Sequence, residues 1–205
     1  MADIRIIKPI YKIKYVACSG GIDSMVLYSF IKRVNDNIIP VFFHHNTETS
    51  ELAYDFLKKE IGNNLVLGKL SSEKPKSKSK EEWWHEERHK FLNSLDGFVG
   101  MAHHLNDVAE TYIFNMTNGK DWLIPYKNKN ILRPFLLTKK ENLVKWGMKH
   151  KIRFIEDKSN FDTSFARNRV RKNILPEIEK INKGFLTVVR KMLEKQCRSS
   201  IGRSF

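Results

Sequence analysis

The stretch KYVACSGGIDSMVLYSFI, residues 14–31, decides the fold. Its first five residues are mostly apolar and predict a buried strand. Ser19-Gly20-Gly21-Ile22-Asp23-Ser24 then predicts a tight turn, because glycine tolerates backbone angles that other residues avoid. After the turn, apolar residues recur at helical spacing to position 31. A strand that enters a helix through a glycine-rich turn is typical of α/β proteins.

The same alternation continues along the chain. Strands are expected at 38–43, 65–70 and 98–102, and helices at 50–61, at 81–95 and from about residue 106. This order predicts an α/β fold with an open, mostly parallel sheet and helices on both faces, a Rossmann-like arrangement. Ligands of such sheets bind at the carboxyl ends of the strands.

The pattern is looser after residue 120. A short strand at 131–132, a helix at 139–149 and a basic amphipathic helix at 176–198, with a break near Gly184, are expected. We expect one catalytic domain over residues 1–205, with an α/β core over about 14–160 and a basic helical part over about 161–205. The Lys- and Ser-rich segment 71–80 is expected to be a mobile loop.

Composition excludes several classes of protein. Of the 205 residues, 41% are hydrophobic and 29% charged, which is typical of a globular protein. The sequence contains no apolar run of about 18 residues and no secretory signal pattern, so we expect a cytoplasmic protein. The two cysteines, Cys18 and Cys197, are too few and too far apart for a disulfide framework, a zinc ribbon or a dithiol redox site.

Charge is distributed unevenly. The chain has 37 Lys and Arg against 23 Asp and Glu, a formal net charge of +14. Residues 1–119 contain 15 basic and 15 acidic residues, so the whole excess lies in residues 120–205. This asymmetry favours a catalytic half joined to a half that binds a polyanion, although a basic surface kept for solubility is an equally good interpretation of charge alone.

The glycine turn has the composition of a phosphate site. Backbone amides at Gly20 and Gly21, the N-terminus of the following helix and the hydroxyls of Ser19 and Ser24 can all bind an anion. Asp23 fits such a site if it holds a cation, for which Mg²⁺ is the obvious choice. The loop has no lysine, so it is not a Walker A loop. A simple Gly-Gly turn with Ser24 capping a helix is the structural alternative.

A second group of polar residues follows the strand expected at 98–102. Two neighbouring histidines at a strand end, His103 and His104, more often reach a ligand than a lone buried histidine does. Asp107 and Glu110 lie at i and i+3 on one helix, so both can face the same pocket. The alternative for Asp107 is a carboxylate that interacts with the helix dipole. His44-His45, after the second strand, can reach the nucleotide from the same edge.

Five motifs, in order along residues 14–176, resemble one family. SGGIDS resembles the SGGxDS loop of the PP-loop ATPases, and AHHLNDVAET (102–111) resembles the AHHxDDQxET signature of tRNA(Ile)-lysidine synthetases. EDKSN (156–160) with RNRVR (167–171), RPFL (133–136) and RHKFL (88–92) are similar to further motifs of that family. The resemblance implies that ATP adenylates a wobble cytidine, pyrophosphate leaves, and free L-lysine then displaces AMP to form lysidine in tRNA(Ile) with a CAU anticodon.

The resemblance also implies roles for individual residues, with ATP and Mg²⁺ as cofactors. It assigns catalysis to Asp23, His103, Asp107 and Arg167, and ATP binding to Ser19, Gly20, Gly21, Asp23 and Ser24, with Asp23 also holding Mg²⁺. Lysine would be held by Asp107, Glu110 and Asp157, and tRNA or phosphate by Arg88, Arg167 and Arg171. It implies no membrane and no stable protein partner. It covers the catalytic N-terminal domain of the family only.

Two departures from the family pattern leave alternatives open. Asn106 stands where the family has the first Asp of its DD pair, and His85 replaces an arginine. A PP-loop enzyme that adenylates a different nucleobase, with another amine or sulfur donor, is one alternative. A non-catalytic RNA-binding relative is the other. Trp83 and Trp84 are candidates for stacking on unpaired bases, although many tryptophans belong to the core.

Overall fold

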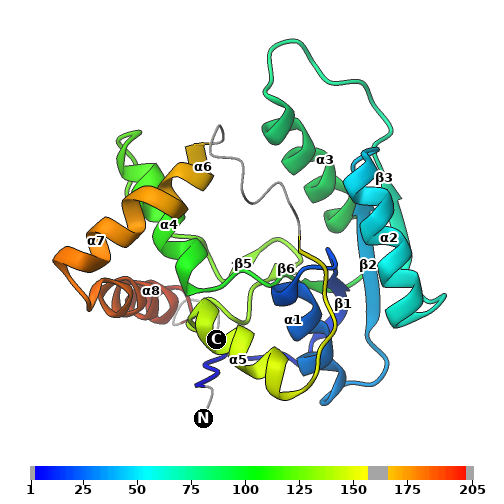
Figure 1. Ribbon diagram of the computed structural model, residues 1–205, viewed down its shortest axis with the longest axis horizontal. Helices are drawn as coiled ribbons and strands as arrows, with labels where there is room; N and C mark the ends of the chain where they lie inside the picture. Colours follow the sequence, from blue (N-terminus) through cyan, green and yellow to red (C-terminus); the bar gives the residue numbers. More distant parts are fainter. Residues whose placement is uncertain (1–2, 157–165, 202–205) are drawn as a thin grey trace.

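A computed structural model of the chain describes residues 3–156 and 166–201 (Figure 1). Six strands form one sheet in the order β3-β2-β1-β4-β6-β5. The strands are β1 (Ile13–Ala17), β2 (Ile39–His44), β3 (Val66–Lys69), β4 (Phe98–Gly100), β5 (Lys127–Asn128) and β6 (Ile131–Leu132). All neighbours pair in parallel except β5, which runs antiparallel to β6. The predicted mostly parallel sheet is confirmed.

Helices connect the strands and extend beyond the sheet. They are α1 (Ile22–Lys32), α2 (Glu48–Ile61), α3 (Lys80–Ser94), α4 (Leu105–Met116), α5 (Lys140–Lys149), α6 (Ala166–Arg169), α7 (Leu175–Ile181) and α8 (Phe185–Ile201), with a π-helical turn η2 (Val170–Ile174) between α6 and α7. Within the described residues, no helix has the length and apolarity that crossing a bilayer requires.

Helices cover both faces of the sheet, as predicted. One face carries a core in which Val16 and Phe42 pack with residues of α1, α2 and α5, such as Leu57. On the opposite face, Tyr15 and Val99 pack with Leu92 of α3. The alternation of side chains along β1 produces this division, because successive residues of a strand point to opposite faces.

A third core lies beside the sheet. It joins α4 to η2, α7 and α8 through residues such as Ala109, Val170 and Val189. Figure 1 shows these helices grouped on one side of the sheet, opposite α2 and α3. The predicted break in the C-terminal basic helix is confirmed, since α7 ends at Ile181 and α8 begins at Phe185. The segment between β3 and α3 contains neither helix nor strand.

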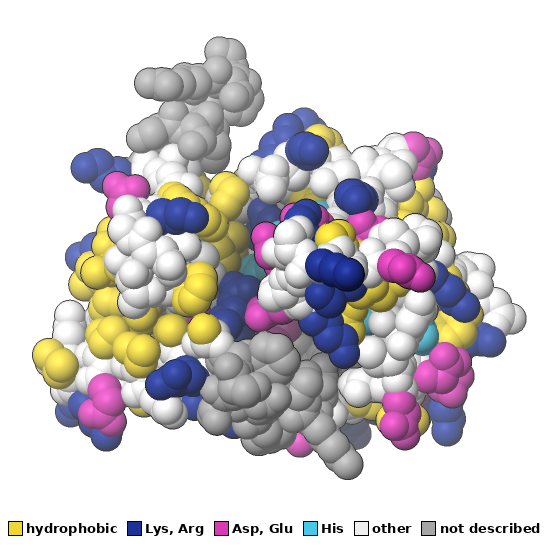
Figure 2. All heavy atoms as spheres, turned by 90° about the horizontal axis from the view of Figure 1, so that it is seen from above, with side chains coloured by type: hydrophobic (Ala, Val, Ile, Leu, Met, Phe, Trp, Pro, Cys, Tyr) yellow, Lys and Arg dark blue, Asp and Glu magenta, His cyan; other side chains and the backbone are white. Residues whose placement is uncertain are grey.

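The order of the strands places the site. From β1 the chain proceeds outward to β2 and β3, then returns to form β4 on the other side of β1. A crevice outside the carboxyl ends of the strands at such a switch point is the usual ligand site of open α/β sheets. Seen from above, basic, acidic and histidine side chains gather in a hollow near the middle of the molecule (Figure 2).

Candidate active site

The glycine loop leaves β1 and opens α1. Gly20 has a φ of +83°, a conformation that side chains other than glycine disfavour. Its carbonyl accepts a hydrogen bond from the Ile155 amide at 3.0 Å. The Ser19 amide donates to Ser24 Oγ at 3.0 Å, and this hydroxyl donates to the Gly21 carbonyl at 2.9 Å. The N-cap residue of α1 is Gly21, which has no side chain to cap the helix, so within the described part of the chain the first amides are available to an anion.

The two predicted motifs meet at one edge of the sheet. Val16 of β1 pairs with Gly100 of β4, and Ser19 and His103 each follow three residues later. A cavity of about 340 Å³ opens there. Its polar lining includes the predicted residues Ser19, Asp23, Ser24, Arg88, His103 and Asp107, together with His45, Thr49 and Ser50. Its apolar lining includes Val41, Phe42, Phe43, Ala53 and Leu92.

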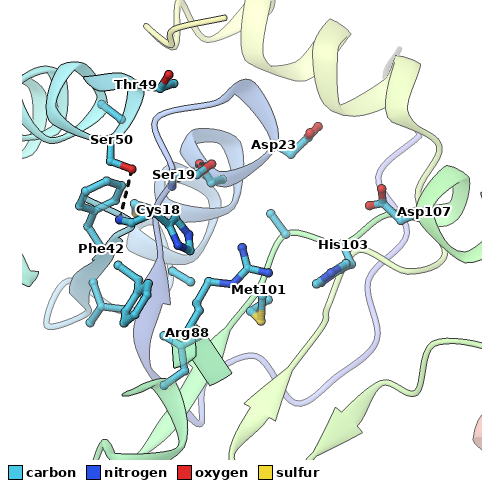
Figure 3. Close-up of a pocket in the computed structure, with 18 residues that line it drawn as sticks. Cys18, Ser19, Asp23, Phe42, Thr49, Ser50, Arg88, Met101, His103 and Asp107 are labelled. Carbon is cyan, nitrogen blue, oxygen red and sulfur yellow. Dashed lines mark hydrogen bonds between the residues drawn. The ribbon is translucent and has the colours of Figure 1, made fainter. Parts of the chain in front are cut away.

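Arg88 and His103 face each other across this cavity. Figure 3 shows the Arg88 guanidinium and the His103 ring turned towards the same space, with Asp23 and Asp107 beyond it. Burial lowers the pKa of His103 to about 3, aided by the cations of Arg133, Arg167 and Arg88 and opposed by Asp107. His103 is therefore neutral at pH 7, and its buried Nδ1 has no hydrogen-bond partner among the described residues.

His104 and Asp107 have a structural role as well. They form a capping box at the start of α4: His104 Nδ1 accepts from the Asp107 amide at 3.3 Å, and Asp107 Oδ2 accepts from the His104 amide at 2.9 Å. Burial alone would raise the pKa of Asp107. The nearby His104 and His103, the backbone bond and Arg167 outweigh it and hold the pKa at about 2. Asp107 is thus ionised, and one of its two carboxylate oxygens stabilises the start of α4.

Arg171 joins the two carboxylates of α4. Its Nε donates to Glu110 Oε1 at 2.8 Å and its Nη2 to Glu110 Oε2 at 2.9 Å, a bidentate pair. The same Nη2 donates to Asp107 Oδ1 at 3.1 Å. Burial lowers the pKa of Arg171, but the bonds to Glu110 and the charges of Glu110 and Asp107 raise it overall. The carboxylates predicted to hold lysine are therefore neutralised by this chain's own cation.

Asp23 has a cation partner too, and it comes from α5. Lys140 Nζ donates to Asp23 Oδ2, and His104 Nε2 lies 3.8 Å from the same oxygen. Asp23 Oδ1 is buried without a hydrogen-bond partner in the described part of the chain. No group of three or more His, Cys, Asp or Glu side chains among residues 3–156 and 166–201 can enclose a metal. A single carboxylate with a free oxygen fits Mg²⁺, which usually binds through one or two carboxylates plus phosphate and water.

Two arginines at or near the cavity, Arg88 and Arg133, have no acidic partner among the described residues. Arg133 is 5% exposed and donates from Nη1 to the Pro125 carbonyl, but its Nε has no partner. Arg88 Nε is also buried and unpartnered. Burial lowers the pKa of Arg88, with a contribution from Arg167, and burial with Arg88 lowers the pKa of Arg133 to about 10. Across the described residues no ion pair joins an acidic side chain to either guanidinium, so this region favours an anion.

Asp23 also borders a second cavity, of about 270 Å³. Its lining consists of Asp23, His104, Asn106, Glu110, Lys140, Arg171, Leu175, Pro176 and Glu179. The departure from the family motif, Asn106, has a structural task here, because its Oδ1 accepts from the Lys140 amide at 2.9 Å and ties the start of α5 to α4. An amide oxygen serves this purpose as well as a carboxylate does.

The structure therefore brings most predicted site residues together around two cavities that share Asp23. Arg167 lies at the margin, where its Nη2 donates to Thr111 Oγ1 at 2.7 Å. Asp157 lies outside the described residues. The roles assigned to these residues stay predictions.

Sequence reasoning assigned no role to Lys140, Arg133 or Glu179, although Arg133 is the first residue of the RPFL motif. The absence of a lysine from the glycine loop was the one signal for a distant cation such as Lys140.

Residues 5–178 match a family model described as a PP-loop domain. The chain is 31% identical over 207 residues to a protein named tRNA(Ile)-lysidine synthase from Thermosipho africanus, covering 87% of this chain and 47% of the relative. A protein of the same name from Persephonella marina is 34% identical over 188 residues, covering 82% of this chain and 41% of the relative. The chain thus spans less than half the length of these two curated relatives.

Among solved structures, an NH3-dependent NAD synthetase from Campylobacter jejuni is 13% identical, with a TM-score of 0.45, covering 91% of this chain and 86% of that protein.

Proposed function

The chain belongs to the PP-loop domain family, and from this premise we propose that it is an ATP-dependent ligase that converts a wobble cytidine of tRNA(Ile) into lysidine. The observation that carries the proposal is that a phosphate-binding loop and a group of histidine and carboxylate side chains lie at the same switch point of the sheet. The glycine loop faces His103 and Asp107 across the cavity of about 340 Å³, and Glu110 lines the second cavity, which shares Asp23 with the first. The two relatives named tRNA(Ile)-lysidine synthase support the choice of substrate.

In the first proposed step, the cytidine O2 attacks the α-phosphorus of ATP. A bond from O2 to phosphorus forms, the bond from that phosphorus to the bridging oxygen breaks, and pyrophosphate leaves. The loop amides and the hydroxyls of Ser19 and Ser24 hold the leaving pyrophosphate, for which the Ser24 hydroxyl turns away from the Gly21 carbonyl. The Arg88 guanidinium stabilises charge on the α-phosphate. Neutral His103 can exchange a hydrogen bond with the reacting group without adding charge.

Mg²⁺ held by Asp23 would neutralise charge on the phosphates, and the free Oδ1 of Asp23 fits that task.

In the second proposed step, the ε-ammonium of lysine gives one proton to the Glu110 carboxylate, and the resulting neutral ε-amine attacks C2 of the adenylated cytidine. The new carbon–nitrogen bond forms, the bond from C2 to O2 breaks, and AMP leaves. Asp107 and Glu110 attract the positively charged lysine side chain, which competes with Arg171 for these two carboxylates. Because the pKa of Asp107 is about 2, Asp107 suits the role of counter-ion better than that of base.

The test is a single assay with the purified protein. Mg-ATP, labelled lysine and a CAU-anticodon tRNA(Ile) transcript are incubated together, and the digested nucleosides are analysed for lysidine. We expect lysidine from the wild type and none from Asp23→Ala. Asp96→Asn is the matched control, because Asp96 is an exposed carboxylate just before β4, at the opposite edge of the sheet, and should leave the yield unchanged.

The assay also separates the alternatives. Pyrophosphate release without lysidine indicates a different donor or a different nucleobase. RNA binding without pyrophosphate release indicates a non-catalytic relative. Either result rejects the proposed function.

A further inference from the structure

The glycine loop contains no basic residue, although it is built to bind phosphate. Many phosphate loops add a lysine that reaches the β- and γ-phosphates. Here the ammonium beside the loop comes from Lys140, the first residue of α5, 117 positions away from Asp23 in the sequence. Lys140 and Asp23 also line the second cavity together.

Two contacts hold this lysine at the loop. The Lys140 amide donates to Asn106 Oδ1 at 2.9 Å, which fixes the start of α5 against the start of α4. Further along α5, Gly147 lies against α1, so closely that a Cβ would be 2.8 Å from Ile22 Cδ1 and 3.0 Å from Val26 Cγ2. Because α5 is packed on the helix that the loop opens, the position of the Lys140 backbone is set by the fold.

The ion pair itself is open to exchange. The Lys140 side chain is 37% exposed and that of Asp23 28% exposed, and the ammonium contacts only one of the two carboxylate oxygens. Lysine carries a point charge on a flexible stem, which can turn from one anion to another without moving the backbone. A phosphate at the loop would be such an anion, next to Asp23.

We propose that Lys140 is the phosphate-binding lysine of this site. It pairs with Asp23 while the loop is empty and turns to the bound pyrophosphate group when phosphate and its divalent cation enter. Asp23 is thereby released for the cation, so one side chain serves as a counter-ion before binding and as a ligand after it. This inference rests on the proposed use of ATP at the loop but not on the identity of the nucleic acid.

The first test measures binding of inorganic pyrophosphate in the presence of Mg²⁺ by calorimetry. Loss of a charge-assisted hydrogen bond weakens binding by about 10- to 100-fold, which we expect for Lys140→Met. Lys140→Arg should retain most of the affinity because it keeps the charge. Lys139→Met is the matched control, since Lys139 is the preceding lysine and its ammonium lies 3.8 Å from Glu141 instead. Binding of adenosine, which has no phosphate, should be equal in all four proteins.

A second measurement uses a variant that is expected to strengthen pyrophosphate binding. Without a divalent cation, Asp23→Asn frees the ammonium from its carboxylate, so pyrophosphate should bind about 2- to 5-fold more tightly than to the wild type, as expected for loss of a partly exposed pair. Lys140→Met should still bind it more weakly. A lysine with a purely structural role would not produce these opposite changes.

The outcomes are distinct from those for the proposed function. Equal pyrophosphate affinity in Lys140→Met and the wild type rejects the role of Lys140, as does an equal loss of adenosine binding. A wild type that binds pyrophosphate in this pattern but makes no lysidine rejects only the proposed substrate. A wild type that binds no pyrophosphate overturns both.

Discussion

Replacement of Arg171 by methionine should destabilise the protein strongly. Arg171 makes a bidentate pair with Glu110, whose side chain is 2% exposed, and a further bond to Asp107. Without the guanidinium, Glu110 would be a buried carboxylate lacking its cation. An unpaired buried charge loses its solvation and gains nothing in return, so the cost should exceed the loss of an ordinary hydrogen bond.

The magnitude follows from the burial of the two partners. Removing one member of a buried ion pair costs about 3–5 kcal/mol. Because the Arg171 side chain is 37% exposed, water can reach part of the site, and we take the lower end, about 3 kcal/mol. In a chain of this size that corresponds to a fall in Tm of about 6–12 °C. Replacing both partners, in Arg171→Met with Glu110→Met, removes both charges and should cost only about 1 kcal/mol.

The measurement is urea unfolding followed by the fluorescence of the four tryptophans. Lys180→Met is the control, because its ion pair with Glu177, at 2.7 Å, has side chains 72% and 65% exposed. That variant should lose no more than about 0.5 kcal/mol. Glu110→Met is also measured alone. If the loss in the double variant equals the sum of the losses in Arg171→Met and Glu110→Met, the two residues are not coupled. That result, or an Arg171→Met as stable as the control, would refute the reasoning.

Three further predictions concern the glycine loop, the hydrogen bond at the start of α5, and the dependence of stability on pH. Gly20→Ala should lower the free energy of unfolding by about 1–2 kcal/mol, because its φ is positive. It should also weaken ATP binding, because the new Cβ would lie 3.0 Å from Ile155. Gly62→Ala has a similar φ of +89° and no atom within 4 Å of the new Cβ, so urea titrations should show only the backbone loss. Asn106→Ala should lower the free energy of unfolding by about 1 kcal/mol in thermal unfolding, because the Lys140 amide at the start of α5 loses its acceptor, whereas Asn106→Asp should retain that bond. Burial, with nearby His85, Arg88 and Arg133, lowers the pKa of His89 to about 3, so the unfolded chain binds a proton between pH 6.5 and 3 that the folded chain does not. Stability should therefore fall as pH drops through that range, and urea titrations at pH 7.5, 5.5 and 4.5 should show a smaller fall for His89→Gln.

The elements that could be predicted from sequence have their own apolar periodicity. The strands and helices from β1 to α4, and α5, form within one or two residues of the expected bounds. Most of them contain an apolar run or stripe, as in β2, which is buried along most of its length, whereas α3 buries only Leu92. Three short elements gave no such signal, and one of them is α6, of which no residue is buried. β5 consists of the exposed Lys127 and Asn128, and η2 is a π-helical turn of five residues in which only Val170 is buried. Neither is long enough for a period to be visible.

The site was predictable in its residues but not in its pairings. Residues that follow the parallel strands β1 and β4 must lie at one edge, so Ser19 and His103 could be placed together. The pairs that neutralise the carboxylates join positions far apart in the sequence, 117 for Asp23 with Lys140 and 61 for Glu110 with Arg171. They depend on how α5 packs on α1 and how η2 packs on α4, which no local pattern encodes.

These pairings leave an excess of positive charge at the site. Asp23, Asp107 and Glu110 each have a basic partner, whereas among the described residues Arg88 and Arg133 have no acidic one. Burying an unpaired cation is costly, and a fold keeps it only where something else repays the cost. The proposed substrates would bring that charge, since nucleotide and RNA both carry phosphates. Each would also free a carboxylate: phosphate would draw Lys140 from Asp23, and the lysine substrate would compete with Arg171 for Asp107 and Glu110. The site is thus a set of internal ion pairs whose members can exchange partners with the two proposed substrates.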